Sequence, residues 1–190
     1  MTWTLFETAI GQCGVAWSEA GLTWVQLPEL DRDATRARLL SKLTDAGAMA
    51  TSNSMPPWVK DAIMRIQEHL TGNAQDLSPI PLDLARVPPF TAKVLRAAQA
   101  VPAGQTATYG ELAAIAGSPG AARAAGQAMA TNPWPVVVPC HRVVAAGGGA
   151  GGFSAHGGVV TKEKLLQLEG GTLTPADSSA QVALFGPRSV

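Results

Sequence analysis

The sequence has little that could cross-link it or bind a structural metal. It holds two cysteines in 190 residues, Cys13 and Cys140, which excludes a disulfide-rich scaffold. One disulfide between them is not expected, because we place the chain in a reducing compartment. The three histidines and two cysteines show none of the paired short spacings of a zinc site. We therefore expect reduced thiols and no metal.

Long hydrophobic runs are also missing. No apolar run approaches the ~20 residues that a membrane helix needs. The N-terminus lacks the basic patch and apolar stretch of a signal peptide. We expect a cytoplasmic protein without membrane association.

The chain has no excess of either charge, since 14 basic residues balance 14 acidic ones. A neutral total argues against a nucleic-acid partner, but the charges are unevenly placed. Residues 1–89 hold seven Lys and Arg against ten Asp and Glu, whereas residues 90–170 hold six against three. This separation is a weak indication that the second half faces a polyanion.

Residues 1–87 read as a small α/β unit that ends in a proline-rich linker. Short apolar and β-branched stretches predict three strands, at Trp3–Ile10, Cys13–Trp17 and Leu22–Leu27. One helix is expected over 31–46, with Asp31 or Asp33 as its N-cap, and a second over Pro56–Leu70.

Residues 88–171 read as mostly helical. Helices are expected at Phe90–Val101, Tyr109–Ala116, Ala121–Ala130 and Lys162–Glu169. The tight turn at 117–120 joins two short helices, which is the pattern of a helix-turn-helix. The glycine-rich stretch 145–158 predicts a loop, and residues 172–190 a flexible tail.

Four blocks in this second half carry a family resemblance. The segment Asn132-Pro-Trp-Pro-Val-Val-Val-Pro-Cys-His-Arg-Val-Val144 resembles the active-site motif of the O6-alkylguanine-DNA alkyltransferases. Thr108-Tyr-Gly-Glu-Leu-Ala113 and Ala122-Arg-Ala-Ala-Gly126 are similar to that family's helix-turn-helix. Lys162-Glu-Lys-Leu-Leu-Gln-Leu-Glu-Gly170 is similar to its closing helix. Their common order and spacing make the likeness specific.

The resemblance implies a fold and an activity. The fold is an α/β N-terminal domain, with a small ribonuclease H-like sheet and helices, followed by a mostly α, winged-helix-like domain with the helix-turn-helix. The activity is DNA repair by irreversible transfer of the alkyl group from O6-alkylguanine, and from O4-alkylthymine, to Cys140. It implies one turnover per molecule, no cofactor and a monomer.

The chemistry needs a thiolate, because a thiol is a poor nucleophile and free cysteine has a pKa near ~8.5. The resemblance makes Cys140 the nucleophile and His141 its base through a water molecule, with Glu169 orienting His141. Tyr109 matches the donor that stabilises charge on the departing base. Asn132 matches the residue that braces the turn before the active-site strand.

The resemblance also assigns the DNA surface. Reaching O6 requires flipping the base out of the duplex, and Arg123 matches the residue that fills the resulting gap. Small residues on the same helix allow close approach to the minor groove. The expected contacts, independent of sequence, are Thr108, Tyr109, Arg123, Ala124, Ala125 and Gly126.

The expected substrate pocket is lined by Met129, Pro135, Val143, Phe153 and Ser154. The carbonyls of Cys140 and Val143 match those that accept from the guanine amino group. The loop departs from the family pattern, with Phe153 where tyrosine is frequent and Ala155–His156 as extra residues, which leaves the accepted alkyl size open. We read His156 as a solvated loop histidine, Arg142 as a salt-bridge residue and Cys13 as buried.

Three other readings remain at this stage. A non-catalytic relative that recognises alkylated bases would lack the cysteine, which is present here as Cys140. A helix-turn-helix regulator would need several base-reading side chains, whereas 121–130 offers only Arg123 and Gln127. A cysteine hydrolase would need an oxyanion hole and repeated turnover, and an adjacent Cys–His pair on a strand end is not a typical arrangement for one.

Overall fold

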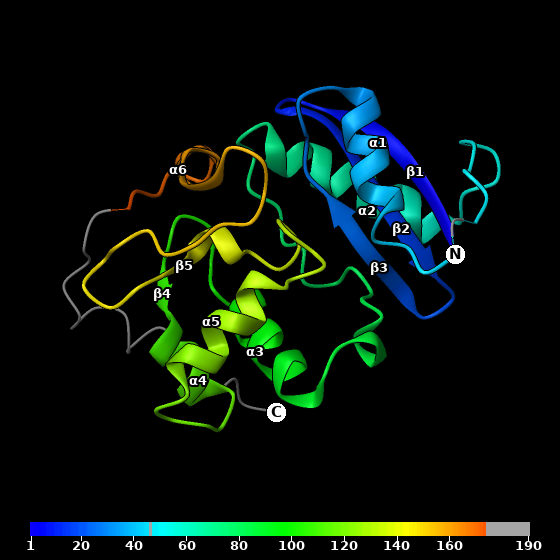
Figure 1. Ribbon diagram of the computed structural model, residues 1–190. Helices are drawn as coiled ribbons and strands as arrows, with labels where there is room; N and C mark the ends of the chain where they lie inside the picture. Colours follow the sequence, from blue (N-terminus) through cyan, green and yellow to red (C-terminus); the bar gives the residue numbers. More distant parts are fainter. Residues whose placement is uncertain (46, 174–190) are drawn as a thin grey trace.

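A computed structural model describes residues 1–45 and 47–173. The chain begins with an antiparallel sheet of three strands, β1 (Thr2–Thr8), β2 (Gly11–Ser18) and β3 (Gly21–Gln26), in the order β1-β2-β3 (Figure 1). The predicted strands are confirmed. Side chains alternate between the two faces, so Ala16 packs with Trp3 on one face while Val15 and Cys13 join the larger core on the other.

Two helices cover the two faces of this sheet (Figure 1). Helix α1 (Arg32–Leu40) begins at Asp31, whose carboxylate accepts the backbone N–H of Ala34. It is shorter than the expected 31–46, because the chain turns at Ser41, whose hydroxyl donates to the carbonyl of Arg38. Helix α2 (Pro57–Leu70) lies as predicted, with Val59, Ile63 and Ile66 in the core, and a short 3-10 turn, η1 (Leu84–Arg86), follows.

The second half is mostly helical, and its helix-turn-helix is α4 (Tyr109–Ile115) followed by α5 (Ala122–Ala130). Helix α3 (Pro89–Gln99) packs against both. Helix α6 (Gly158–Leu168) begins four residues earlier than predicted. Two short parallel strands, β4 (Ala107–Thr108) and β5 (Val143–Val144), link the helix-turn-helix to the active-site segment.

The two halves share one hydrophobic core. The backbone N–H of Val25 on β3 donates to the carbonyl of Pro133, and Leu22 bonds in the same way to Pro81, both at 2.8 Å. The free edge of β3 is thereby paired with segments from the second half and from the linker, which fixes the halves relative to each other. The boundary at 87/88 stays a prediction.

No helix in the described ranges is long and apolar enough to cross a membrane. The tail predicted over 172–190 lies outside the described residues, except for its first two.

Candidate active site

A tight turn over residues 132–138 presents the cysteine. The amide of Asn132 donates to the carbonyl of Val138 at 2.8 Å, and its oxygen accepts the backbone N–H of Trp134 at 2.9 Å. Val136 has φ +74°, a conformation that costs energy for a β-branched residue. The strain sits next to the active cysteine and is held by the bonds of Asn132, which takes the bracing position that the resemblance assigned.

Cys140 lies between the Asn132 turn and the strand that the resemblance places after it. It begins a 3-10 turn, η2 (Cys140–Arg142), and only the residues after this turn form a strand, β5. The backbone N–H groups of Cys140 and His141 in this turn act to lower the pKa of the thiol. Such donors favour the thiolate.

The environment of the thiol opposes ionisation at rest. Burial raises the pKa of Cys140, although the Asn132 side chain and the positive charge of Lys162 act to lower it. Cys140 therefore holds its proton near neutral pH and needs a base. Cys13 is fully buried, and burial raises its pKa to about 12, so it is an inert core thiol as predicted.

His141 follows this thiol in the same 3-10 turn. Its side chain is buried, and Nε2 lies 2.7 Å from Oε1 of Glu169. Nδ1 is buried without a hydrogen-bond partner among the described residues. Burial lowers the pKa of His141, and the Glu169 carboxylate only partly offsets this. A neutral imidazole with Nε2 on the carboxylate leaves the Nδ1 lone pair to accept a proton.

Glu169 follows α6 and is enclosed by donors. Burial acts to raise its pKa, but hydrogen bonds from His141, His69 and Arg142 outweigh burial and hold the pKa far below the usual range. Arg142 binds both carboxylate oxygens at 2.8 Å. Arg142 is thus a salt-bridge residue, as predicted, and Glu169 stays ionised.

Tyr109 lies at the start of α4, where Thr108 and Glu111 form a capping box. Burial raises the pKa of Tyr109, and the nearby Cys140 raises it further, while the backbone N–H of Gly152 has the opposite effect. The tertiary structure thus brings Tyr109, Cys140 and the glycine-rich loop together.

A cavity of about 330 Å³ opens onto Cys140. The expected residues Pro135, Phe153 and Ser154 line it, together with Asn132. The N-terminal half also contributes, because Trp24 and residues 25–27 of β3 and its extension form one wall, with further lining from Glu29, Arg38 and Lys42.

Two expected pocket residues lie elsewhere. Met129 is buried in the core and does not line this cavity. Val143 is fully buried, and its carbonyl accepts from the ammonium of Lys162, which also binds the carbonyl of Ala150 in the loop. Val143 therefore contributes to the site through its backbone. Its carbonyl oxygen already accepts one hydrogen bond, from Lys162.

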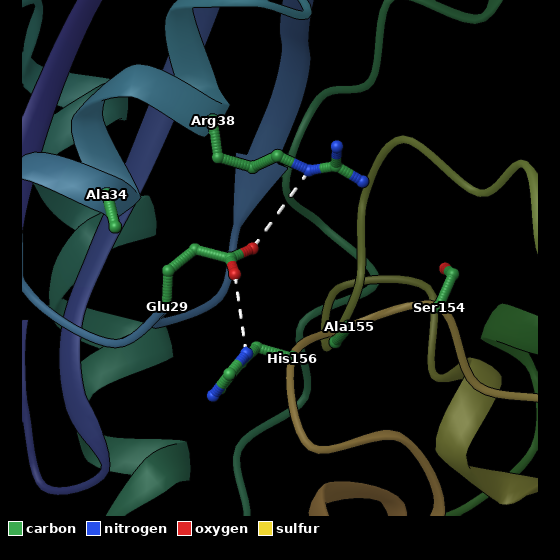
Figure 2. A pocket seen from close by; sticks show the side chains of 6 residues that line it. All are labelled: Glu29, Ala34, Arg38, Ser154, Ala155 and His156. Carbon is green, nitrogen blue, oxygen red and sulfur yellow. Dashed lines mark ion pairs between the residues drawn. The ribbon is translucent and has the colours of Figure 1, made fainter.

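A second hollow adjoins the cavity where the loop meets α1. Figure 2 shows Glu29 between Arg38 and His156, with ion-pair distances of 4.0 Å and 3.6 Å. The side chain of His156 is 46% exposed, which agrees with a loop histidine. Its contact with Glu29 adds a weak link between the loop and the N-terminal half.

Comparison with known proteins identifies the family of this chain. Residues 89–171 match the model of the 6-O-methylguanine DNA methyltransferase, DNA binding domain. A methylated-DNA–protein-cysteine methyltransferase from Methanothermobacter thermautotrophicus is 36% identical over 162 residues, which are 84% of this chain and 80% of that protein. The chain belongs to the O6-methylguanine DNA methyltransferase family.

Solved structures of this family share the whole fold. The Mycobacterium tuberculosis OGT crystal structure in complex with DNA has a TM-score of 0.69 at 30% identity, covering 98% of this chain and 100% of that one. The O6-methylguanine-DNA methyltransferase of Pyrococcus kodakaraensis gives 0.68 at 27%, covering 88% and 99%. The fold expected from the resemblance, a small sheet with helices and then a helical DNA-binding domain, is confirmed.

The helix-turn-helix of this methyltransferase family member exposes part of the expected DNA surface. Arg123 and Ala124 are exposed near the start of α5, and Gly126 is partly exposed against the ring of Tyr109. Ala125 is completely buried. The expectation of a DNA contact therefore needs correction for Ala125, because at this helical phase its methyl group faces the core.

Besides the cavity wall from the N-terminal half, sequence reasoning missed His69 and Lys162. His69 lies 100 positions before Glu169, and only the fold brings them together. Lys162 is fully buried, which lowers its pKa to about 8, although the charge of Cys140 acts against that lowering. A lysine in a helix gives no signal that it will be buried.

Proposed function

We propose that this family member removes the alkyl group from O6-alkylguanine in duplex DNA and retains it on Cys140, with one turnover per molecule. The observation that carries the proposal is the arrangement of three residues. Cys140 opens onto a cavity, His141 follows it in the same turn, and the buried Glu169 carboxylate holds the His141 ring at 2.7 Å. This is the arrangement of an activated nucleophile.

The first step is proton transfer. Because burial keeps Cys140 as a thiol, the proton passes to Nδ1 of His141 through a bridging water. Glu169 stabilises the imidazolium that results, since its carboxylate stays ionised. The thiolate receives help from Asn132, Lys162 and the backbone N–H groups of η2.

The second step is displacement at carbon. The sulfur attacks the alkyl carbon, a C–S bond forms, and the C–O6 bond breaks with its electron pair moving onto the guanine. The departing guanine then takes up one proton, which balances the proton that the thiol gave to His141. Tyr109, which shares the site with Cys140, is the proposed donor that stabilises the departing base.

Access to the lesion depends on the helix-turn-helix. The exposed Arg123 is proposed to fill the gap left by the flipped base, while Ala124 and Gly126 allow α5 to approach the minor groove. Thr108 caps α4 and positions Tyr109. Binding through phosphates makes the interaction independent of sequence. O4-alkylthymine presents the same alkyl ether and is a second proposed substrate.

The test mixes the protein with a duplex oligonucleotide that carries one O6-methylguanine. Intact and peptide masses then locate any added methyl group. The expected result is one methyl on the peptide that contains Cys140 and one repaired base per protein molecule. Cys140→Ser should gain none, whereas Cys13→Ala is the matched control and should react like the wild type. Reduced wild-type protein that binds the lesion without gaining mass would instead support the base-recognition alternative.

A further inference from the structure

A histidine from the N-terminal half reaches the carboxylate of the relay. His69 lies in the last turn of α2, and its side chain is only 2% exposed. Its Nε2 is 2.8 Å from Oε1 of Glu169, and this is the same oxygen that His141 contacts at 2.7 Å. Two imidazoles from opposite halves of the protein therefore share one oxygen atom.

The other nitrogen of His69 fixes the direction of this bond. Nδ1 lies 3.1 Å from the backbone nitrogen of Gln75 and accepts its hydrogen. A ring nitrogen that accepts has no proton, so in a neutral ring Nε2 carries it. His69 therefore donates to Glu169 and does not compete for a proton.

Groups other than His69 also hold the Glu169 carboxylate in place. Arg142 binds Oε1 and Oε2, each at 2.8 Å, and the backbone N–H of Gly104 lies 3.4 Å from Oε2. Oε1 then receives three donors, from His69, His141 and Arg142. All three donors share the negative charge of one carboxylate. The hydrogen bond from His69 therefore reduces the stabilisation that Glu169 gives to a protonated His141 ring.

We propose that His69 is a positioning residue that acts through Glu169, and that its Nε2–H bond adds to burial in keeping His141 neutral at the pH of repair. This inference rests on the proposed function, because it concerns the proton acceptor of that reaction. It makes the end of α2 part of the reactive centre.

Besides the two histidines, Arg142 and the backbone N–H of Gly104 bind the oxygens of Glu169, and the positive charge of Arg142 also acts on His141. No group of three or more His, Cys, Asp or Glu within residues 1–45 and 47–173 has the arrangement of a metal site. The two histidines are therefore read as donors to a carboxylate.

The experiment measures the single-turnover rate of methyl transfer from a duplex as a function of pH. The rate falls on the acidic side as His141 becomes protonated. In His69→Phe, one donor to Oε1 is lost, the imidazolium of His141 is better stabilised, and its pKa rises. The pH of half-maximal rate should then rise by about 0.5–1 unit, so that the rate at acidic pH is about three- to tenfold lower. His69→Gln, which restores an N–H donor, should return the midpoint towards the wild-type value.

Leu70→Ala is the matched control, because it removes a buried side chain from the same helix end without touching Glu169. It should lower stability and leave the midpoint in place. An unchanged midpoint in a folded His69→Phe protein would overturn the inference, and so would an equal shift in Leu70→Ala or in His69→Gln.

A second measurement needs no variant. Nitrogen NMR of the wild-type protein should show His69 protonated on Nε2 and not on Nδ1, and the opposite tautomer would overturn the inference even if the Phe variant failed to fold. Failure of the proposed function itself looks different, because wild-type protein would then transfer no methyl group at any pH.

Discussion

The indole N–H of Trp134 donates to the backbone carbonyl of Leu22 at 2.8 Å, which joins the turn before the reactive cysteine to β3 of the N-terminal sheet. Trp134 is fully buried, and its side chain spans the interface between the two halves. The same carbonyl also accepts the backbone N–H of Asp83, so β3, the linker and the active-site turn meet at one oxygen.

Trp134→Phe should lower the free energy of unfolding by about 1 kcal/mol for the lost hydrogen bond, with a further loss for the smaller ring. Leu22 keeps its bond from Asp83, so no buried acceptor is left unpaired. Methyl transfer should also slow, because the turn before Cys140 loses an anchor. Urea unfolding and single-turnover rates measure the two effects. Trp17→Phe, in the N-terminal core, should reduce stability alone, and an equal slowing there would contradict this role.

Asn132→Ala should lower the free energy of unfolding by about 1–3 kcal/mol, since the N–H of Trp134 loses its buried partner, while the carbonyl of Val138 keeps the N–H of Cys140. It should also raise the pKa of Cys140 further, because the Asn132 side chain favours the thiolate. Reaction of Cys140 with iodoacetamide across a pH series reports that pKa. Asn73→Ala, at an exposed position, should change neither quantity.

Glu169→Gln should reduce the dependence of stability on acidity. The pKa of Glu169 is depressed in the folded protein, so its stabilising contribution is complete above the ordinary value of 4.5 and is lost as pH falls towards the folded value. Unfolding free energies at neutral pH and near about pH 3 should therefore differ less in the variant.

The same substitution leaves the Arg142 charge without its partner, which costs about 3–5 kcal/mol at neutral pH. Methyl transfer should also fall, because His141 loses its counter-charge. Glu163→Gln, exposed on α6, is the control and should match the wild type in both assays. Equal acid sensitivity of the wild type and Glu169→Gln would contradict a depressed pKa at this site.

Arg123→Ala should slow methyl transfer from duplex DNA by about tenfold, because the flipped-out state loses the side chain proposed to fill the gap. Transfer from the free base O6-methylguanine should be unaffected, because no base is flipped. Arg65→Ala removes the same charge from a partly exposed site on α2, where Arg65 pairs with Asp61, and should leave both rates unchanged. Equal slowing on the duplex and the free base would place Arg123 in the chemistry instead.

The order and type of the elements could be predicted because they follow local rules. Apolar and β-branched stretches predicted β1 to β3, and helical periodicity predicted α2 and α4. Boundaries were less certain where side chains compete with the helix, as Ser41 does at the end of α1. Ala125 lies on the face of α5 that packs against the core. Because α5 is rich in alanine, no stripe of larger apolar residues marked that face in the sequence.

The sequence by itself determined the family and its expected activity. The Pro-Cys-His-Arg segment and the helix-turn-helix are contiguous motifs, so their order and spacing can be recognised without a structure. Only the tertiary structure decided the surroundings of the carboxylate. His69, His141 and Glu169 come from three distant segments, and Trp24, Arg38 and Lys42 reach the cavity because β3 and α1 pack beside the active-site turn. Contacts of that kind depend on how the helices and strands pack, and the order of residues in the chain does not show which distant side chains will touch.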